Sequence, residues 1–521
     1  MPEVPWWQSA VVYQIYPRSF AFAAPATTRG VGNLQGIRQH LDHLAWLGAD
    51  AVWVSPFYRS PMTDFGYDVS DYCDVDPLFG TLDDFDALVT DAHQRGIKVL
   101  VDWVPNHTSD QHPWFIESRS SRSAAKREWY IWRDPAPGGG PPNNWVAAFT
   151  NASAWTLDPA SGQYYLHLFL PSQPDLEWRN PEVVAAMHDV LRFWLDRGVD
   201  GFRMDVVHAI GKDRQLSDDA AELLPIPHSA LNHDPSTHGL ISGLRHVLEE
   251  YDGDRMMVGE VFLLDTAMVA SYYGRGEGLH LAFNFPPLFT AWEPEPWRAR
   301  LREVAEHFQP IDAWPTWVLS NHDNPRHRTR YGGSEARARA AAVLLLTLRG
   351  TPFLFAGEEL GLEDAIVTPD RVVDPGGRDG CRAPIPWDES ADHGWGVTDA
   401  WLPWPPEADR RNVEVQRADA GSMLHLYRRL LAGRRASAAL RLGNIEVFGR
   451  EALPQGLLGW ERCSDEGDRR VVLVNFLPED ITLSDLGPWS DLTVEVASDG
   501  AGEGQRFAAT LGPDQAVILR P

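Results

Sequence analysis

Three acidic residues follow short apolar runs, in a pattern that could bring them to one rim of a folded sheet. Asp205 ends the run Gly201–Asp205, Glu260 follows the run Met256–Val258, and Asp323 follows a third run. A single carboxylate in such a place is as often a helix cap or a loop hydrogen-bond acceptor as a reactive group. Several carboxylates forced together must share protons or do chemistry, because like charges disfavour one another's ionisation. An ionised carboxylate beside a protonated one can attack the anomeric carbon of a sugar and protonate the leaving oxygen, which is the equipment for cleaving a glycosidic bond.

The local sequence suggests which carboxyl group is ionised. Arg203 precedes Asp205 by two positions, so in a strand both side chains point to the same face, and the guanidinium favours the charged form of the carboxylate. Glu260 has no basic neighbour in sequence and follows an apolar run, so we expect it to hold its proton longer. These features predict Asp205 as nucleophile and Glu260 as general acid/base. A separation of about 5–5.5 Å between the two groups would give retention of configuration, and roughly 6.5–9.5 Å would give inversion.

Eight short β-branched or aromatic segments alternate with longer amphipathic stretches. The strands formed by these segments must bring the acidic residues to one edge of a sheet. The alternation predicts an α/β fold, a (β/α)8 TIM barrel, in which the carboxyl ends of all strands meet at one face. That face would also receive Asp102 from the third strand. The predicted strands are Val11–Tyr16, Ala51–Ser55, Lys98–Val104, Gly201–Asp205, Met256–Val261, Leu281–Phe285, Thr316–Ser320 and Pro352–Ala356.

Two stretches depart from the alternation. A segment rich in Pro, Gly, Asn and Trp lies between the third and fourth predicted strands and predicts an excursion domain. The helical pattern stops near residue 435, and Val471–Asn475 and Leu492–Val496 are typical of antiparallel strands. We therefore expect a catalytic barrel of residues 1–104 and 181–435, an excursion domain of residues 105–180, and a C-terminal β-sandwich domain of residues 436–521.

Composition excludes several classes of partner. The chain has 46 basic and 73 acidic residues, a formal charge of −27, so nucleic acid and anionic membranes are expected to be repelled. We find no basic-then-apolar leader and no apolar run of membrane-spanning length. Cys73, Cys381 and Cys463 are too few and too far apart for a disulfide framework or a zinc site. We expect a cytoplasmic protein without a cofactor, a monomer or a small homo-oligomer.

Four blocks of the sequence, in this order and spacing, resemble glycoside hydrolase family 13, the α-amylase family. They are Asp102-Trp-Val-Pro-Asn-His107, Gly201-Phe-Arg-Met-Asp205, Gly259-Glu-Val261 and Ser320-Asn-His-Asp323. Further segments are similar to the oligo-1,6-glucosidase and α-glucosidase branch, among them Tyr13-Gln-Ile-Tyr-Pro-Arg-Ser-Phe20, Gly66-Tyr-Asp-Val-Ser-Asp-Tyr72, Gln173-Pro-Asp-Leu176, Gly357-Glu-Glu359 and Arg378-Asp-Gly-Cys-Arg382. The resemblance extends from about Trp6 to about Trp387.

The resemblance implies a role for each matching residue. It implies that Asp205 is the nucleophile, Glu260 the acid/base, and Asp323 a third carboxylate that holds ring hydroxyls. It also implies a set of substrate-binding residues around one terminal glucose, a pocket closed at the non-reducing end, and exo-acting hydrolysis of small α-glucosides through a covalent glucosyl-enzyme intermediate. This set consists of Asp64, Tyr67, His107, Phe149, Phe169, Arg203, His322, Arg378 and Arg382.

The sequence also departs from the family pattern. The loop Ala24–Leu34 has lost the aspartates of the family's calcium loop and carries Arg29, so we expect no metal there. A second metal position around Asn106 stays open. Glu177 replaces an asparagine, with no evident effect. Val206, directly after the proposed nucleophile, resembles relatives that cleave α-1,6 bonds.

Two other functions remain open at the level of sequence. An isomerase or sucrose-active transglucosylase would use the same carboxylates and retain the released sugar, which the arginine-dense stretch Asn324–Arg330 could hold. The plainer interpretation is that Arg328 is a solvated loop charge. A non-catalytic partner of a membrane transporter is disfavoured, because the chain keeps Asp205, Glu260 and Asp323.

Overall fold

The computed structural model contains all eight predicted strands, joined in one parallel sheet. It describes residues 4–24, 30–483, 489 and 491–521. The strand order is β11-β10-β9-β5-β2-β1-β13-β12, which closes nearly into a barrel and confirms the predicted fold class. The strands are β1 (Val12–Ile15), β2 (Ala51–Val54), β5 (Lys98–Trp103), β9 (Gly201–Met204), β10 (Met256–Gly259), β11 (Leu281–Ala282), β12 (Thr316–Val318) and β13 (Thr351–Phe355).

A side chain joins the two edges of this sheet, β11 and β12. The Thr316 hydroxyl accepts a hydrogen bond from the Asn284 N–H (3.2 Å) and donates one to the Ala282 carbonyl (2.8 Å). Thr316 is fully buried. A buried backbone N–H or C=O without a hydrogen-bond partner lowers stability. The Thr316 hydroxyl supplies such partners where the short strands β11 and β12 do not pair directly.

The inside of the barrel is filled by large side chains, among them Trp53, Met256, Phe283 and Phe353. Helices cover the outside, and local sequence fixes where they begin: Thr81 and Asp84 form a capping box at the start of α5. A filled barrel leaves only the ends of its strands for a site. The covering helices are α3 (Leu34–Gln39), α4 (Leu41–Leu47), α5 (Leu82–Gln94), α7 (Pro181–Asp196), α8 (Ser236–Glu249), α9 (Thr266–Ser271), α10 (Pro294–Phe308), α12 (Glu335–Thr347) and α14 (Met423–Ala436).

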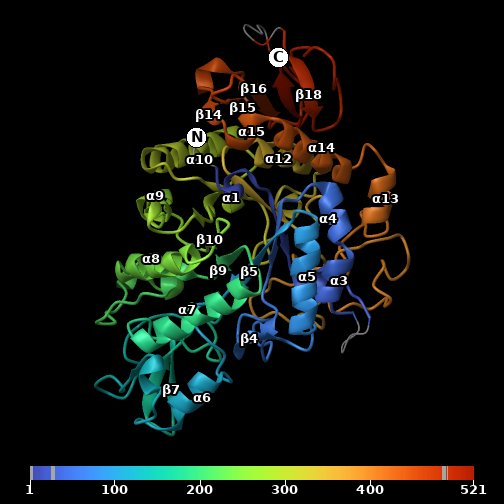
Figure 1. The fold of residues 1–521 in the computed structure, drawn as a ribbon. Coiled ribbons are helices and arrows are strands. Elements are labelled where there is room, and N and C mark those ends of the chain that lie inside the picture. Colours follow the sequence, from blue (N-terminus) through green and yellow to red (C-terminus); the bar gives the residue numbers. More distant parts are fainter. Residues whose placement is uncertain (1–3, 25–29, 484–488, 490) are drawn as a thin grey trace.

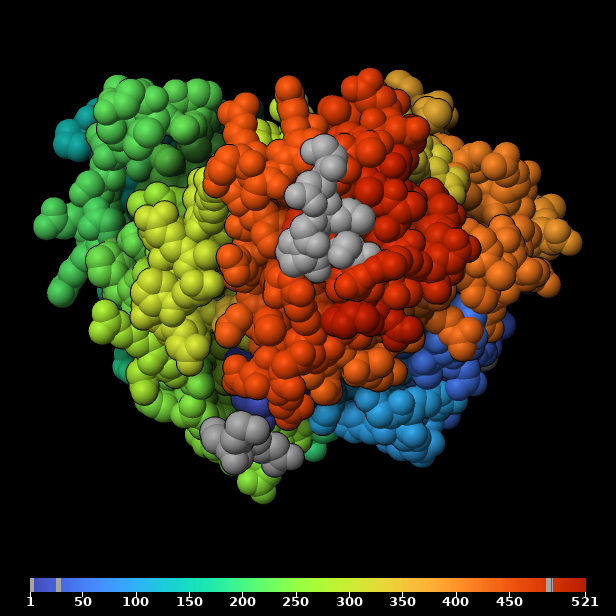
Figure 2. Space-filling view, turned by 90° about the horizontal axis from the view of Figure 1, so that it is seen from above, coloured from blue at the N-terminus to red at the C-terminus, as the bar shows by residue number. Residues whose placement is uncertain are grey.

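Two further groups of elements lie at opposite ends of the molecule (Figure 1). After β5 come α6 (Pro113–Ser120) and the sheet β6-β8-β7, formed by Trp132–Arg133, Gln163–Leu166 and Trp155–Asp158. At the other end, an antiparallel sheet covers the centre of the molecule as seen from above (Figure 2). Its order is β14 (Asn444–Val447), β15 (Leu457–Cys463), β16 (Arg469–Asn475), β20 (Ala516–Arg520) and β18 (Thr493–Ala497).

The C-terminal sheet packs against a second, small layer. The pair β17 (Ile481–Thr482) and β19 (Thr510–Leu511) contributes to the same apolar cluster as Val471, Leu473 and Leu519 of the larger sheet. Helical structure extends beyond residue 435, because α15 (Ala438–Leu442) follows α14 directly. The predicted domain boundaries stay predictions.

Three predictions about calcium, membrane spans and disulfides can be compared only with the residues that the structure describes. Residues 25–29 of the loop predicted to lack calcium, including Arg29, lie outside them. In the described ranges no helix has the length and apolarity needed to cross a bilayer. Cys73, Cys381 and Cys463 are free thiols.

Replacing Thr316 by valine tests the seam of the barrel. Thr316→Val keeps the shape of the side chain but leaves the Asn284 N–H and the Ala282 carbonyl without partners, so we expect the free energy of unfolding to fall by about 1–3 kcal/mol in urea denaturation. Thr482→Val on exposed β17 is the matched control and should change it by less than about 0.5 kcal/mol. Equal midpoints for the two variants would contradict the proposed seam.

Candidate active site

The ends of three adjacent strands place the central acidic residues. Asp205 and Glu260 are the first residues after β9 and β10, and each continues the parallel ladder by one hydrogen bond. The Asp205 N–H donates to the Trp103 carbonyl and the Glu260 N–H to the Met204 carbonyl, both at 2.8 Å. Because the ladder fixes the backbone, the two side chains emerge beside each other on the barrel face.

One guanidinium connects three of the carboxylates. Arg203 Nη1 lies 2.8 Å from Asp102 Oδ1 and 2.7 Å from Asp205 Oδ1, and Nη2 lies 2.5 Å from Glu260 Oε2. Glu260, which has no basic neighbour in sequence, therefore has one in space. The reason is register, since Arg203 of β9 pairs with Asp102 of β5 on one side and with Val258 of β10, two residues before Glu260, on the other.

Three carboxylates share this one cation, so they cannot all be ionised cheaply. Burial raises the pKa of Asp102 to about 6, although Arg203 opposes the shift. Burial also raises the pKa of Asp205 well above its usual range; Arg203 lowers it, whereas Glu260 and Asp102 raise it further. Arg203 thus favours the charged form of Asp205, as the sequence suggested, but burial and the two neighbouring carboxylates outweigh it in the free site. We infer that the raised pKa of Asp205 keeps a proton within this cluster in the free site.

The residue after Asp205 has a strained backbone. Val206 has φ 33° and ψ 41°, a left-handed conformation that a β-branched residue rarely adopts and that costs on the order of 1–3 kcal/mol. In this conformation the Val206 N–H donates to Glu260 Oε2 at 3.1 Å. The strain therefore holds a backbone donor against the carboxyl group of Glu260.

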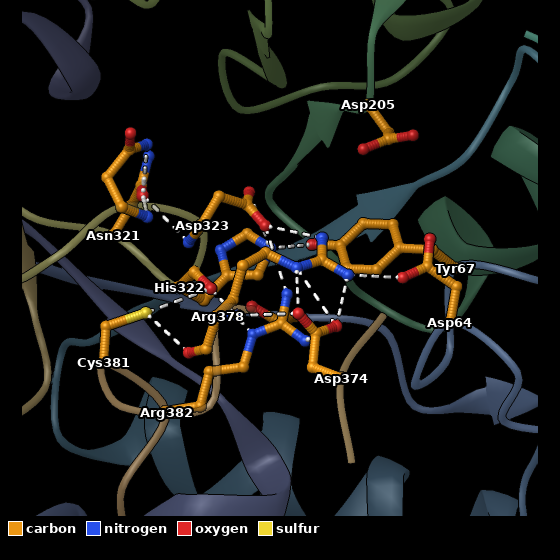
Figure 3. A network of polar contacts seen from close by, with 12 residues as sticks. Asp64, Tyr67, Asp205, Asn321, His322, Asp323, Asp374, Arg378, Cys381 and Arg382 are labelled. Carbon is orange, nitrogen blue, oxygen red and sulfur yellow. Dashed lines mark hydrogen bonds and ion pairs between the residues drawn. The ribbon is translucent and has the colours of Figure 1, made fainter. Parts of the chain in front are cut away.

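A second ionic network lies across the cavity from Asp205 (Figure 3). Arg378 contacts Asp323 Oδ1 (3.0 Å), Asp64 Oδ1 (2.6 Å) and Asp374 Oδ1 (2.7 Å). Arg382 is buried behind it and binds Asp323 Oδ1 at 3.1 Å. Asp374 was not predicted from the sequence; it lies four positions before Arg378 and is 2% exposed. Its charge neutralises the two arginines from behind.

His322 is a neutral link between the two networks. Gln14 Nε2 donates to His322 Nδ1 (2.7 Å), which leaves the proton on Nε2, 2.6 Å from the Tyr67 hydroxyl and 3.2 Å from Asp323 Oδ2. Burial lowers the pKa of His322 to about 3. The Tyr67 hydroxyl in turn donates to Asp102 Oδ2 at 3.1 Å. Sequence reasoning missed Gln14, whose signal was a polar side chain inside the apolar strand β1.

Asp323 stays ionised in this setting. Burial would raise its pKa, but His322, Arg378 and Arg382 together lower the pKa of Asp323 below its usual range. The carboxylates at the two sides of the cavity thus differ: the pKa values of Asp102 and Asp205 near Arg203 are raised, whereas the pKa of Asp323 is lowered.

A buried carboxylate also shapes the loop that carries Asp64 and Tyr67, between β3 (Tyr58–Arg59) and β4 (Asp71–Val75). Asp68 accepts hydrogen bonds from the Thr63 N–H (2.9 Å) and the Asp64 N–H (3.0 Å). It is fully buried. The loop is therefore held by its own sequence before any ligand binds.

These groups surround a cavity of about 390 Å³. Nine of the twelve predicted site residues line it: Asp64, Tyr67, His107, Phe149, Phe169, Asp205, Glu260, Asp323 and Arg378. The other three, Arg203, His322 and Arg382, are not among the lining residues and contact those that are. The His107 Nε2–H is directed to the Tyr67 carbonyl at 3.2 Å.

A side-chain ammonium lies at the position around Asn106 that was left open for a metal. Lys212 Nζ lies 2.5 Å from Asn106 Oδ1 and 2.9 Å from Asp175 Oδ2. It occupies the place between the two oxygens with a fixed charge. Glu177, also of uncertain role, forms a two-pronged ion pair with Arg179 at 2.8 and 2.7 Å.

The arginines of Asn324–Arg330 are directed into the protein. Arg326 donates to the Ala356 carbonyl and Arg328 to the Gly361 carbonyl, both at 2.8 Å. Arg328 is 6% exposed and pairs with Glu363. It is neither a sugar-binding group nor a solvated charge, because the short helix α11 (His327–Arg330) turns it inward.

Known proteins are similar to this chain over most of its length. The family model for the catalytic domain of alpha amylase matches residues 14–443. The chain is 44% identical over 481 residues to a probable alpha-glucosidase of Rhizobium meliloti (strain 1021), covering 85% of each chain. It is 36% identical over 490 residues to an oligo-1,6-glucosidase of Parageobacillus thermoglucosidasius, covering 85% of this chain and 86% of that one.

Two solved structures are similar along the whole chain. The alpha-glucosyl transfer enzyme XgtA has a TM-score of 0.90 at 37% identity, with 99% of this chain and 100% of that one covered. The trehalulose synthase MutB from Pseudomonas mesoacidophila MX-45 has a TM-score of 0.91 at 33% identity, with both chains fully covered.

The crowding around Arg203 predicts that removing one carboxylate stabilises the protein. The folded-state pKa of Asp205 is raised, so in the range above its usual value near 3.8 the unfolded chain releases this proton first, and rising pH costs stability. Asp205→Asn should therefore match the unaltered protein below about pH 4 and exceed it by about 1–2 kcal/mol near pH 7 in thermal unfolding.

Two further variants control this prediction. Asp252→Asn, at an exposed carboxylate, should leave the pH profile unchanged. Arg203→Gln leaves three buried carboxylates without a cation and should destabilise by about 3–5 kcal/mol. An Asp205→Asn variant less stable than the unaltered protein at neutral pH would refute the electrostatic crowding.

Proposed function

The chain belongs to the α-amylase family of glycoside hydrolases, and on that basis we propose that it is a retaining, exo-acting α-glucosidase. It would release, and could transfer, the terminal α-linked glucose of short α-glucosides. The observation that carries the proposal is the contact of Asp205 and Glu260 with the two terminal nitrogens of Arg203. Both carboxyl groups line the cavity, and the ion pairs of Arg378 with Asp64 and Asp323 lie on its opposite side.

The two carboxyl groups divide the chemistry. The bound substrate brings its glycosidic oxygen to Glu260, to which we assign the retained proton, and Asp205 becomes ionised against Arg203. Asp205 attacks the anomeric carbon while Glu260 protonates the leaving oxygen; Glu260 then accepts a proton from the water that cleaves the glucosyl ester. Both carboxyl groups bind the terminal nitrogens of one guanidinium and so lie close together, which supports this route over inversion, because inversion needs room for a water between the acid and the base.

The network around Arg378 would hold the terminal glucose. The ionised Asp323 accepts hydrogen bonds from ring hydroxyls, the neutral His322 supports Asp323 and Tyr67 from behind, and Tyr67 and His107 form the wall. Because the Asp64–Arg378 pair closes this end, no further sugar fits beyond the glucose that is cleaved. That the enzyme acts in the cytoplasm, as a monomer or small homo-oligomer, stays a prediction.

Transfer or isomerisation is the second candidate, favoured by the similarity to an alpha-glucosyl transfer enzyme and a trehalulose synthase. Both reactions use the same glucosyl ester and differ in the hydroxyl that attacks it. Incubation with sucrose and with maltose separates the possibilities, because free glucose indicates hydrolysis and a rearranged disaccharide indicates isomerisation.

The roles of the two carboxylates predict unequal effects of mutation. Asp205→Asn should lower kcat at least about 10³-fold for every α-glucoside, whereas Glu260→Gln should affect maltose far more than p-nitrophenyl α-glucoside, whose leaving group needs little protonation. Proton NMR of early product should show α-glucose first. An initial β-anomer would rule out retention.

The closed end predicts a sharp limit on substrates. An α-glucoside with a bulky group on O4 should not be cleaved. Arg378→Met should lower kcat/KM for maltose by about 10²-fold or more, because it leaves Asp64 without its cation and Asp323 with Arg382 alone. Arg371→Met is the control, since Arg371 pairs with Asp399 away from the cavity. Cleavage of the blocked substrate at an unblocked rate would show that the end is open.

A further inference from the structure

The wall of the cavity around Glu260 differs in character from the closed end. The closed end carries the charges of Asp64, Arg378 and Asp323. A general acid must reach the leaving oxygen, so the residues next to Glu260 border the leaving group and, later, the acceptor. These neighbours are Val206, His208 and Phe262, and all three line the cavity.

His208 offers this space no hydrogen bond. Its Nδ1 lies 3.2 Å from the Glu260 carbonyl and 3.4 Å from the Phe262 N–H, and its Nε2 lies 2.8 Å from the Ser229 carbonyl. Burial lowers the pKa of His208, so the ring stays neutral. Both nitrogens are engaged with backbone, and His208 acts as an apolar wall.

Much of the surrounding wall is aromatic and aliphatic, and the polar residues Ser229, Asn321 and Asn324 also line the cavity. The rings of Phe262 and Phe285 lie 5.3 Å apart, and Val206, Pro227 and Ala230 also line the cavity. The amide nitrogen of Asn324 is directed to Asn321 Oδ1 at 3.0 Å rather than into free space. A sugar in this position would bury several hydroxyl groups against carbon, which costs affinity for each group left unpaired.

We propose that this acceptor subsite takes an aromatic or alkyl alcohol in preference to a sugar, so that the enzyme forms α-glucosides of such alcohols. The inference rests on the glucosyl–Asp205 ester of the proposed function. The acceptor oxygen attacks the anomeric carbon, the bond to Asp205 breaks and returns a carboxylate, and Glu260 takes the hydroxyl proton. The atoms balance without any other reactant, and the product is R–O–glucose with the α configuration.

One assay separates this inference from the proposed function. With p-nitrophenyl α-glucoside at low concentration, released p-nitrophenol counts all glucosyl ester formed, and free glucose counts its hydrolysis. Benzyl alcohol and methyl α-glucoside are added at equal concentration in parallel. The glucose deficit is the amount by which free glucose falls short of released p-nitrophenol. We expect this deficit to be about tenfold larger with benzyl alcohol than with methyl α-glucoside, and benzyl α-glucoside to appear by NMR. Toluene, which lacks a hydroxyl, should produce no deficit.

Variants of Phe262 test the subsite itself. Phe262→Asn should lower the ratio of benzyl transfer to hydrolysis about tenfold, and Phe262→Leu, which remains apolar, should lower it much less. Leu264→Asn, on the same loop but outside the cavity lining, should leave the ratio unchanged. The ratio is counted per turnover, so a loss of folded enzyme does not alter it.

Each result has a defined meaning. Absence of p-nitrophenol release would reject the proposed glucosidase. If p-nitrophenol is released, three results would overturn the apolar subsite and leave the proposed glucosidase intact. They are a larger glucose deficit with methyl α-glucoside, no deficit with benzyl alcohol, and an unchanged ratio of transfer to hydrolysis in Phe262→Asn.

Discussion

The structure of the site depends on one buried arginine that must serve three carboxylates. Arg203 lies on β9, the strand that leads to Asp205. Its neighbours β5 and β10 bring Asp102 and Glu260 to either side of it, so one guanidinium reaches all three carboxyl groups. One positive charge cannot offset three negative ones in a space that excludes water, so a proton has to remain in the cluster. That retained proton is what an acid catalyst needs, and the electrostatic crowding that holds it also costs stability.

The rest of the fold isolates this cluster. Large side chains fill the barrel below it, so water cannot reach the carboxylates from inside. The Thr316 hydroxyl closes the seam between β11 and β12, and the strained Val206 presents its N–H to Glu260. Rigid backbone at each of these points means that the carboxyl groups need little reorganisation when charge develops.

The cavity combines two recognition problems in one space. At the closed end, Arg378 with Asp64, Asp323 and Asp374 forms an ionic network suited to polar hydroxyl groups. Around Glu260, the engaged nitrogens of His208 and the rings of Phe262 and Phe285 leave a wall of carbon. In the proposed function the glycosidic bond lies where these two environments meet, so the part of the substrate on each side would be selected separately.

The sequence alone predicted the eight strands, the barrel and the positions of Asp205, Glu260 and Asp323, because hydrophobic runs and strand-end residues are local properties of a chain. It missed whatever depends on distant partners. Gln14 sets the tautomer of His322 from 308 positions away, Arg203 meets Glu260 only through the pairing of β9 with β10, and Arg328 turns inward to a carbonyl 33 positions away. The proton balance of Asp205 belongs with these, since burial and neighbouring charges are products of packing. Residue types and their spacing therefore determined which groups could react, whereas tertiary structure decided which charges surround them, because electrostatic energy depends on distance in space and not along the chain.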